Sequence, residues 1–188
     1  MAAKESIRDK KQLKPLENYF LKRGQLQNHV LIVMGTCSAY QWPVMSEVVR
    51  RIWRRKTWFS QTCCVDRKKT GKMKTIALNK QVVSALQQHY PHQRSDYILA
   101  SNLKNSKAIS RIQAWRIIHD AVVAVNIPGK IACHSLRKTW DYHAWTSEAV
   151  SPIIIMHIFN HSNYEVTRRY LGVAQDDLDK AYLSMDLF

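Results

Sequence analysis

The chain has 188 residues, of which 46% are hydrophobic, and its 29 Lys and Arg against 14 Asp and Glu give a formal net charge of +15. This length suits one domain with its own core, and no apolar run approaches the roughly 20 residues that span a bilayer. The charged N-terminus lacks the apolar stretch of a secretory signal.

The positive charge is concentrated near the start of the chain. Residues 1–80 hold 18 basic and 5 acidic side chains, so most of the net charge lies there. A surface this basic attracts a polyanion, and DNA would release counterions on binding. Ribosomal and membrane-surface proteins are basic too, so charge alone leaves the partner open. The four cysteines form no C-x-x-C pair and are expected to be reduced thiols.

The first third of the chain predicts two helices. Asp9 can cap a helix through residues 16–21 that ends at Gly24. The apolar residues 30–34 indicate a second helix. From Tyr40 to about Asp66 the apolar spacing favours neither helix nor strand.

Residues 65–78 predict a β-hairpin. The turn falls at residues 69–72, where Gly71 can take a positive φ, and residues 75–78 suit a return strand.

The remaining chain predicts helices. Ser110 caps a helix whose apolar residues Ile112, Trp115, Ile118 and Val122 recur at helical spacing. The other predicted helices cover residues 82–90, 134–144, a segment from 151 on, 162–170 with a capping box at 162–165, and a final helix in 174–188. The expected fold class is mixed α/β, mainly α-helical with a small antiparallel β-sheet.

Five side chains could together break a phosphodiester bond without a metal. Such a reaction needs a nucleophile, a proton acceptor, an acid for the leaving oxygen, and cations on the non-bridging oxygens. The candidates, in chain order, are Lys69, His134, Arg137, His161 and Tyr170.

The pair His134 and Arg137 has helical spacing, so both side chains can face one phosphate near a helix start. Taken alone, an H-x-x-R string is usually two exposed helix residues. Taken alone, Tyr170 after two arginines is usually a partly buried helix residue. The two signals become specific in combination, because His161 lies nine residues before Tyr170 in the same sequence.

Together these residues resemble the tyrosine recombinase (phage integrase) family. The matching strings are residues 66–78, 109–117, 133–139, 160–162 and 167–172. The resemblance is loose over residues 10–40 and close over 65–186. It implies the catalytic-domain fold of DNA breaking-rejoining enzymes.

The resemblance implies a role for each of the five residues. Tyr170 is similar to the nucleophile that forms a 3′-phosphotyrosyl bond, and Lys69 to the general acid for the 5′-oxygen. Arg137 resembles the second family arginine on the non-bridging oxygens, His134 the proton acceptor, and His161 a phosphate-contacting donor. Further expected DNA contacts are Lys68, Lys72, Lys74, Arg111, Lys138, Arg168 and Arg169.

The resemblance implies double-stranded DNA as the partner and a homotetramer on DNA, with no metal, cofactor or membrane. It implies a cytoplasmic, nucleoid-associated location.

The family's first arginine has no counterpart. Gln41 stands at its place, and a glutamine brings no charge to a phosphate. The mismatch extends over residues 40–64, where the sequence departs from the family's pattern although the segments on both sides resemble it. Two compensating changes of reading frame would produce this, and ordinary divergence is the alternative. Translating the gene's other frames across this window distinguishes them.

The expected organisation is one catalytic domain over residues 1–188, with an N-terminal lead (1–12), the divergent segment (40–64), a C-terminal helix (174–188) and no N-terminal core-binding domain. Two functions remain open. The first is an active site-specific recombinase or integrase, impaired by Gln41. The second is a catalytically inactive DNA-binding relative. A metal-dependent nuclease is disfavoured because no paired carboxylates or H-x-H ligands lie near His157 and His161.

Overall fold

The computed structural model describes residues 5–38, 62–66, 73–92, 95, 97–101, 107–147, 150–159, 161–171 and 183–184. The chain forms two compact units, Met1–Trp140 and Asp141–Phe188. Each unit is described by itself. We call them unit 1 and unit 2, and the boundary between them falls within helix α6 (Cys133–Thr146).

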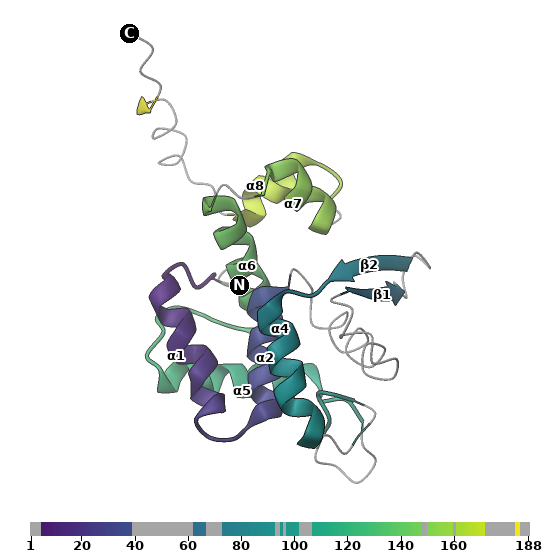
Figure 1. Ribbon diagram of the computed structural model, residues 1–188. Coiled ribbons are helices and arrows are strands. Elements are labelled where there is room, and N and C mark those ends of the chain that lie inside the picture. Colours follow the sequence, from purple (N-terminus) through teal and green to yellow (C-terminus); the bar gives the residue numbers. More distant parts are fainter. Residues whose placement is uncertain are drawn as a thin grey trace. The chain divides into compact units, whose positions relative to one another are not determined.

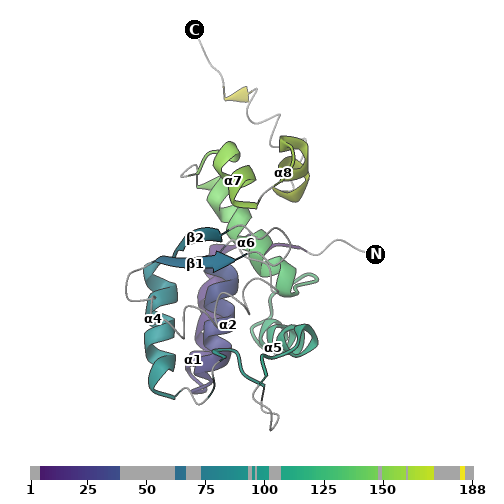
Figure 2. The same ribbon diagram turned by 90° about the vertical axis from the view of Figure 1, so that its right-hand side faces the viewer.

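Unit 1 is built around helix α2 (Figures 1 and 2). This helix contacts α1, α4 and α5, and seven of its twelve residues are buried. Helix α2 spans Leu26–Cys37. The other elements of unit 1 are α1 (Lys10–Leu21), β1 (Thr62–Asp66), β2 (Met73–Ala77), α4 (Lys80–His89), the short 3-10 helix η2 (Tyr90–His92) and α5 (Arg111–Ala124). The apolar sequence of α2 explains its central position, because a helix that is hydrophobic on all sides is stable only when other elements surround it.

Local capping signals determine where several helices begin. The Asp9 side chain accepts from the Lys11 amide at 2.8 Å, and Gly24 has a φ of +66° after α1, as the sequence predicts. Ser110 forms a reciprocal capping box with Gln113 at the start of α5. These caps satisfy amides that the helix itself cannot.

The buried face of α5 differs from the one that its apolar spacing predicts. Ile118 and Val122 are buried as expected, together with Ala114 and Ala121. Ile112 is 63% exposed and Trp115 is 40% exposed. The small alanines allow close packing of α5 on the core, and the larger side chains of its first turn remain outside it.

The expected fold class is wrong in one respect. Among the residues whose backbone and side chains are both described, 68% are helical, and no β-sheet layer is present among them. The expected class, mixed α/β with a small antiparallel β-sheet, is therefore corrected to mainly α-helical. Within the described part of the chain, the strands β1 and β2 form a two-stranded antiparallel ribbon, with Thr62 opposite Ala77. The physical reason lies in the core, since its described side chains come from helices and their connections.

Unit 2 contains the second half of α6, then α7 (Pro152–Phe159) and α8 (Tyr164–Leu171), which pack on each other. Ser151 caps α7 by accepting from the Ile154 amide at 3.4 Å. The expected final helix over residues 174–188 falls outside the described residues except at positions 183–184. No helix in the described ranges has the length and apolar character needed to cross a bilayer.

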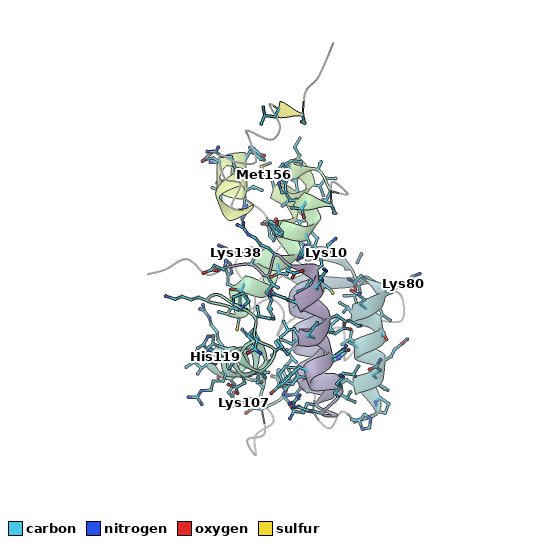
Figure 3. All side chains as sticks on the ribbon, turned by 90° about the vertical axis from the view of Figure 1, so that its left-hand side faces the viewer. Lys10, Lys80, Lys107, His119, Lys138 and Met156 are labelled. Atoms are coloured by element: carbon cyan, nitrogen blue, oxygen red, sulfur yellow. The ribbon has the colours of Figure 1, made fainter. Side chains whose placement is uncertain are left out.

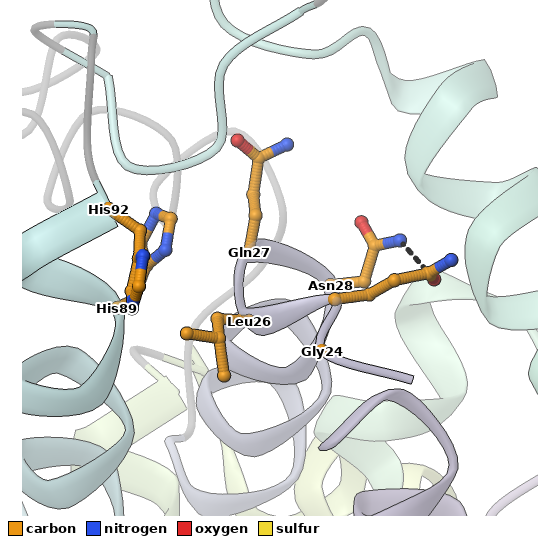
Figure 4. A pocket seen from close by; sticks show the side chains of 7 residues that line it. Gly24, Leu26, Gln27, Asn28, His89 and His92 are labelled. Atoms are coloured by element: carbon orange, nitrogen blue, oxygen red, sulfur yellow. Dashed lines mark hydrogen bonds between the residues drawn. The ribbon is translucent and has the colours of Figure 1, made fainter. Parts of the chain in front are cut away.

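A hollow of about 620 Å³ opens between the start of α2 and the end of α4 (Figure 4). His89 and His92 line one side, and residues 24–28 line the other. None of the residues predicted to act on DNA lines it. Gly35, near the other end of α2, is about 14 Å away from Leu26 along the helix axis.

Acid should destabilise unit 1 through His29. This side chain is 4% exposed, and its Nε2 has no hydrogen-bond partner among the residues that the structure describes. Burial lowers the pKa of His29, Glu17 opposes the shift, and Lys14 and His89 reinforce it. Because the unfolded chain binds this proton more readily, the stability that neutral His29 supplies is complete above about pH 6.5 and is lost as the pH falls below that.

The urea midpoint of unfolding should therefore drop between pH 7.5 and pH 5.5, and His29→Leu should reduce the drop. His119→Gln is the matched control, since His119 is exposed on α5. An equal drop in wild type and His29→Leu would assign the acid sensitivity to other groups.

Candidate active site

The first turn of α6 brings two predicted site residues together. His134 and Arg137 lie three residues apart on this helix, as the sequence predicts. His134 is partly buried and Arg137 is 7% exposed. Burial restricts the rotamers of the long arginine side chain, so the planar guanidinium is preorganised for a bidentate contact.

The two residues between them hold this turn in place. Ser135 is fully buried, and its Oγ accepts from the Ala132 amide at 3.1 Å, which satisfies an amide at the helix start. Leu136 is 1% exposed and packs against Gly35 of α2. In the sequence His-Ser-Leu-Arg, two anchoring side chains thus stand between the two candidate site residues.

The close contact with α2 makes Gly35→Ala a sensitive test of the helix position. A Cβ atom at Gly35 would lie 2.5 Å from Leu136 Cδ1 and 3.1 Å from Leu136 Cβ. Overpacking of this kind costs about 1–3 kcal/mol, against about 1 kcal/mol gained in helix propensity. We expect a net loss of roughly 1 kcal/mol in the free energy of unfolding, measured in urea.

A double-mutant cycle supplies the control, because the penalty of Gly35→Ala should disappear in a Leu136→Ala background. A stabilised Gly35→Ala protein would show that α6 is not held against α2.

The electrostatics of this turn favour a neutral imidazole. Burial lowers the pKa of His134, and the positive charges of Arg137, Lys138 and Arg111 lower it further. A histidine with a lowered pKa is neutral at pH 7 and can accept a proton. This protonation state fits the proton-acceptor role that the family resemblance implies for His134.

A hollow of about 400 Å³ lies beside His134, between the starts of α5 and α6. Arg111 and Trp115 line it from α5, and Cys133 lines it from α6. Burial raises the pKa of the Cys133 thiol, so it stays protonated at neutral pH. Figure 3 draws the side chains around this part of unit 1 and labels Lys138 on α6 and His119 on α5.

The N-terminal segment also supports α6, which sequence analysis did not anticipate. Ile7 is 1% exposed, and its amide donates to Thr139 Oγ1 at 2.9 Å. The Thr139 hydroxyl in turn donates to the Ser135 carbonyl at 2.8 Å. Ile7, within the segment described above as a lead, is thus packed against the helix that carries His134 and Arg137.

Unit 2 holds two further predicted residues, His161 and Tyr170. His161 lies in the connection between α7 and α8, where its ring stacks on Phe159 with centroids 5.4 Å apart. Its Nδ1 is 2.9 Å from Thr167 Oγ1. The backbone of Tyr170 lies on α8, three residues after Thr167. His161 and Tyr170 are therefore carried by adjoining elements of one unit.

The cap of α8 differs from the predicted capping box at residues 162–165. Asn163 Oδ1 accepts from the Val166 amide at 3.0 Å and is the observed cap. Glu165 instead pairs with Arg168, at 3.2 Å to Nε and 3.1 Å to Nη2. An Arg168 contact with DNA would compete with this exposed ion pair, which is a weak one.

Other predicted positions can be placed only in part. Arg111 is exposed at the start of α5 and Lys138 is half-buried on α6. Lys74 lies on β2 and Arg169 on α8, where the backbone alone is described. Residues outside the described ranges are Gln41, Lys68, Lys69 and Lys72. The structure thus joins His134 with Arg137 in one unit, and His161 with the Tyr170 helix in the other.

A helical core carrying a H-x-x-R turn, followed by a histidine and a tyrosine-bearing helix, defines the class of DNA breaking-rejoining catalytic domains. The sequence model of the phage integrase family matches residues 45–176, well over half of the chain. The chain therefore belongs to the phage integrase family. The matched range begins after Gln41 and includes residues 45–64 of the segment described as divergent.

Individual proteins agree with this assignment. The chain is 26% identical over 182 residues to "Probable integrase/recombinase YoeC" of Bacillus subtilis (strain 168), covering 94% of this chain and 93% of that protein. The crystal structure of XerA recombinase is similar with a TM-score of 0.77 at 15% identity, over 97% of this chain. This chain spans only 66% of that one.

The catalytic domain of bacteriophage HP1 integrase is similar with a TM-score of 0.56 at 14% identity, over 98% of this chain and 97% of that domain. At these identities, the solved structures establish the fold alone. The mainly helical fold of tyrosine recombinase catalytic domains is thus confirmed for this chain.

Sequence reasoning assigned no function to three residues that support the site. Gly35 allows the close approach of α6, Thr139 receives the N-terminal segment, and Thr167 contacts His161. Thr139 and Thr167 each carried a local signal, because they lie within the matching strings 133–139 and 167–172. The roles of Gly35 and Thr139 depend on partners over 100 residues away in sequence.

Proposed function

We propose that this chain is a site-specific DNA recombinase that cleaves and rejoins double-stranded DNA through a 3′-phosphotyrosyl intermediate. The observation that carries the proposal is the first turn of α6. There, a partly buried imidazole with a lowered pKa shares a helix face with a buried guanidinium. A neutral base beside a fixed cation suits attack on a phosphodiester.

In the proposed reaction, the Tyr170 phenol oxygen bonds to the scissile phosphorus and the bond from phosphorus to the 5′-oxygen breaks. His134 takes the phenol proton, and Lys69 gives a proton to the departing 5′-oxygen. Arg137 holds the non-bridging oxygens through parallel N–H groups, and His161 donates to the same phosphate. The phosphotyrosine retains the bond energy, so a 5′-hydroxyl from another strand can reverse the step without a nucleotide.

Further basic residues are proposed to contact DNA. Arg111 stands at the exposed start of α5, beside the hollow that His134 lines. Lys138 directly follows Arg137 on α6. The remaining proposed contacts are Lys68, Lys72, Lys74, Arg168 and Arg169. These cations would bind phosphates without reading bases, so affinity should fall steeply with salt.

XerH is described in a post-cleavage complex with a palindromic difH substrate, and the Tn1549 integrase in complexes with circular-intermediate DNA. By this likeness we propose that the present chain acts on two DNA sites as a homotetramer, at the nucleoid.

A covalent-trapping experiment tests the proposal. The substrate is a pool of DNA duplexes with randomised arms and a nick close to the expected cleavage position. Cleavage beside the nick releases a short DNA fragment that diffuses away, so religation cannot reverse the step. We expect a protein–DNA adduct that survives denaturation, with the DNA attached to the peptide containing Tyr170. Persistence of the adduct in EDTA separates this reaction from that of a metal-dependent nuclease.

A second candidate function rests on Gln41, which replaces a charged phosphate ligand with a neutral amide. In this case, the chain binds DNA and does not cleave it. Binding of the same duplex pool without any adduct would favour this inactive relative over the recombinase.

A further inference from the structure

In its neutral form, His161 can donate to a phosphate from only one of its two ring nitrogens. A neutral imidazole carries its proton on Nδ1 or on Nε2, and the hydrogen bond at one nitrogen selects the state of the other. The role proposed above for His161 is donation to a phosphate oxygen, which requires a proton on the nitrogen that faces DNA.

The neighbour that decides this is Thr167. Its side chain has no exposed surface, and its Oγ1 lies 2.9 Å from His161 Nδ1. Within the described residues, this nitrogen is the hydroxyl's one hydrogen-bond partner. A buried hydroxyl that cannot reach water must donate its proton to an acceptor. Donation from this hydroxyl to Nδ1 would leave the imidazole proton on Nε2.

Two further contacts restrain the ring and the backbone of His161. Phe159, which is 6% exposed, stacks on the imidazole at an interplanar angle of 24°. The His161 amide donates to the Met156 carbonyl at 3.1 Å, which ties the backbone to α7. The ring is thus held on one face by an aromatic side chain and at one nitrogen by a hydroxyl.

Thr167 also connects the histidine to the helix of the nucleophile. It lies on α8, one helical turn before Tyr170, and α8 begins at the cap that Asn163 forms. A rigid helix transmits a displacement along its axis, so a movement of the Tyr170 backbone also moves the hydroxyl that orients His161.

We propose that Thr167 is a positioning residue that holds His161 in the Nε2–H form and couples its orientation to the helix that carries Tyr170. The proposal rests on the function proposed above, because it assigns Thr167 to the same site. Thr167 itself would not touch the reacting atoms. Its contribution is to present a donor rather than an acceptor to the phosphate.

The first test reads the tautomer and requires no activity. Nitrogen NMR of the full chain labelled at histidine, with His161 assigned by its absence in His161→Gln, reports which ring nitrogen carries the proton. We expect Nε2–H in the wild type and in Thr167→Ser, and a mixture of tautomers in Thr167→Val, which has the same shape without the hydroxyl. A proton on Nδ1 in the wild type would overturn the proposal.

The second test measures single-turnover adduct formation on the nicked duplexes. Loss of a group that orients a functional histidine costs about 10- to 100-fold in activity in comparable sites, and we expect a fall of that size for Thr167→Val at unchanged DNA affinity. Thr167→Ser should restore the rate. Thr146→Val is the matched control, since its exposed hydroxyl donates to the Tyr142 carbonyl of its own helix.

The outcomes separate the two proposals. A wild type with Nε2–H that forms no adduct would refute the recombinase function and leave the tautomer assignment standing. Equal adduct rates for Thr167→Val and Thr167→Ser would overturn the positioning role while the recombinase function stands. If Thr167→Val does not fold by circular dichroism, Thr167→Ala takes its place, and the wild-type tautomer decides independently.

Discussion

Replacing Tyr170 with phenylalanine should eliminate the covalent protein–DNA adduct completely and leave DNA affinity nearly unchanged. Phenylalanine keeps the aromatic ring and lacks the phenol oxygen that would bond to phosphorus, so no other group can substitute for it in the same position. DNA affinity depends mainly on the basic side chains, which this variant retains. Gel analysis after denaturation measures the adduct, and filter binding measures the affinity.

The matched control for Tyr170→Phe lies on the same helix. Tyr164 is 44% exposed in the first turn of α8, so Tyr164→Phe removes a phenol without disturbing a buried contact. This variant should form the adduct at the wild-type rate. An adduct that persists in Tyr170→Phe and disappears in Tyr164→Phe would reassign the nucleophile.

Replacing Gln41 with arginine should increase the rate of adduct formation by about 100- to 1000-fold, because one missing donor at a developing phosphate charge costs that much in comparable sites. Arginine adds a permanent charge and a planar pair of N–H groups, whereas glutamine offers a neutral amide. The increase requires the backbone around residue 41 to follow the family pattern. Single-turnover rates on the nicked duplexes measure the effect.

An added positive charge can also raise DNA affinity without aiding chemistry, so Gln41→Arg needs a control for charge alone. Gln87→Arg adds the same charge at an exposed position of α4. It should change affinity slightly and leave the rate at saturating DNA unaltered. If Gln41→Arg behaves like Gln87→Arg, position 41 does not serve as the first arginine site, and residues 40–64 require a different alignment.

Several helix boundaries were predictable because their signals are local. Asp9 and Ser110 cap the helices that the sequence predicts, since a side chain at a helix start reaches amides only two or three residues away. The spacing of His134 and Arg137 likewise follows from the geometry of one helical turn. Family membership rested on such short strings, and the family match over residues 45–176 confirmed it.

The fold class and the α8 cap were wrong for a different reason. The hairpin pattern predicted a sheet, but a sheet layer requires further strands, and the core is formed by helices instead. At α8, the predicted capping box over residues 162–165 does not form: Asn163 provides the cap, and Glu165 pairs with Arg168 instead. Apolar spacing also could not show that Trp115 lies outside the core, because burial depends on what packs against the helix.

The order of residue types along the chain was sufficient to indicate the family and to nominate Tyr170, His161, Arg137, His134 and Lys69, since chemistry at a phosphate demands those functional groups. The tertiary structure alone showed that Gly35 admits Leu136, that burial lowers the pKa of His134, and that the Thr167 hydroxyl lies within hydrogen-bond distance of His161. These properties depend on contact distance and on exclusion of water. Both arise only when distant segments pack together, so they leave no pattern in the linear sequence.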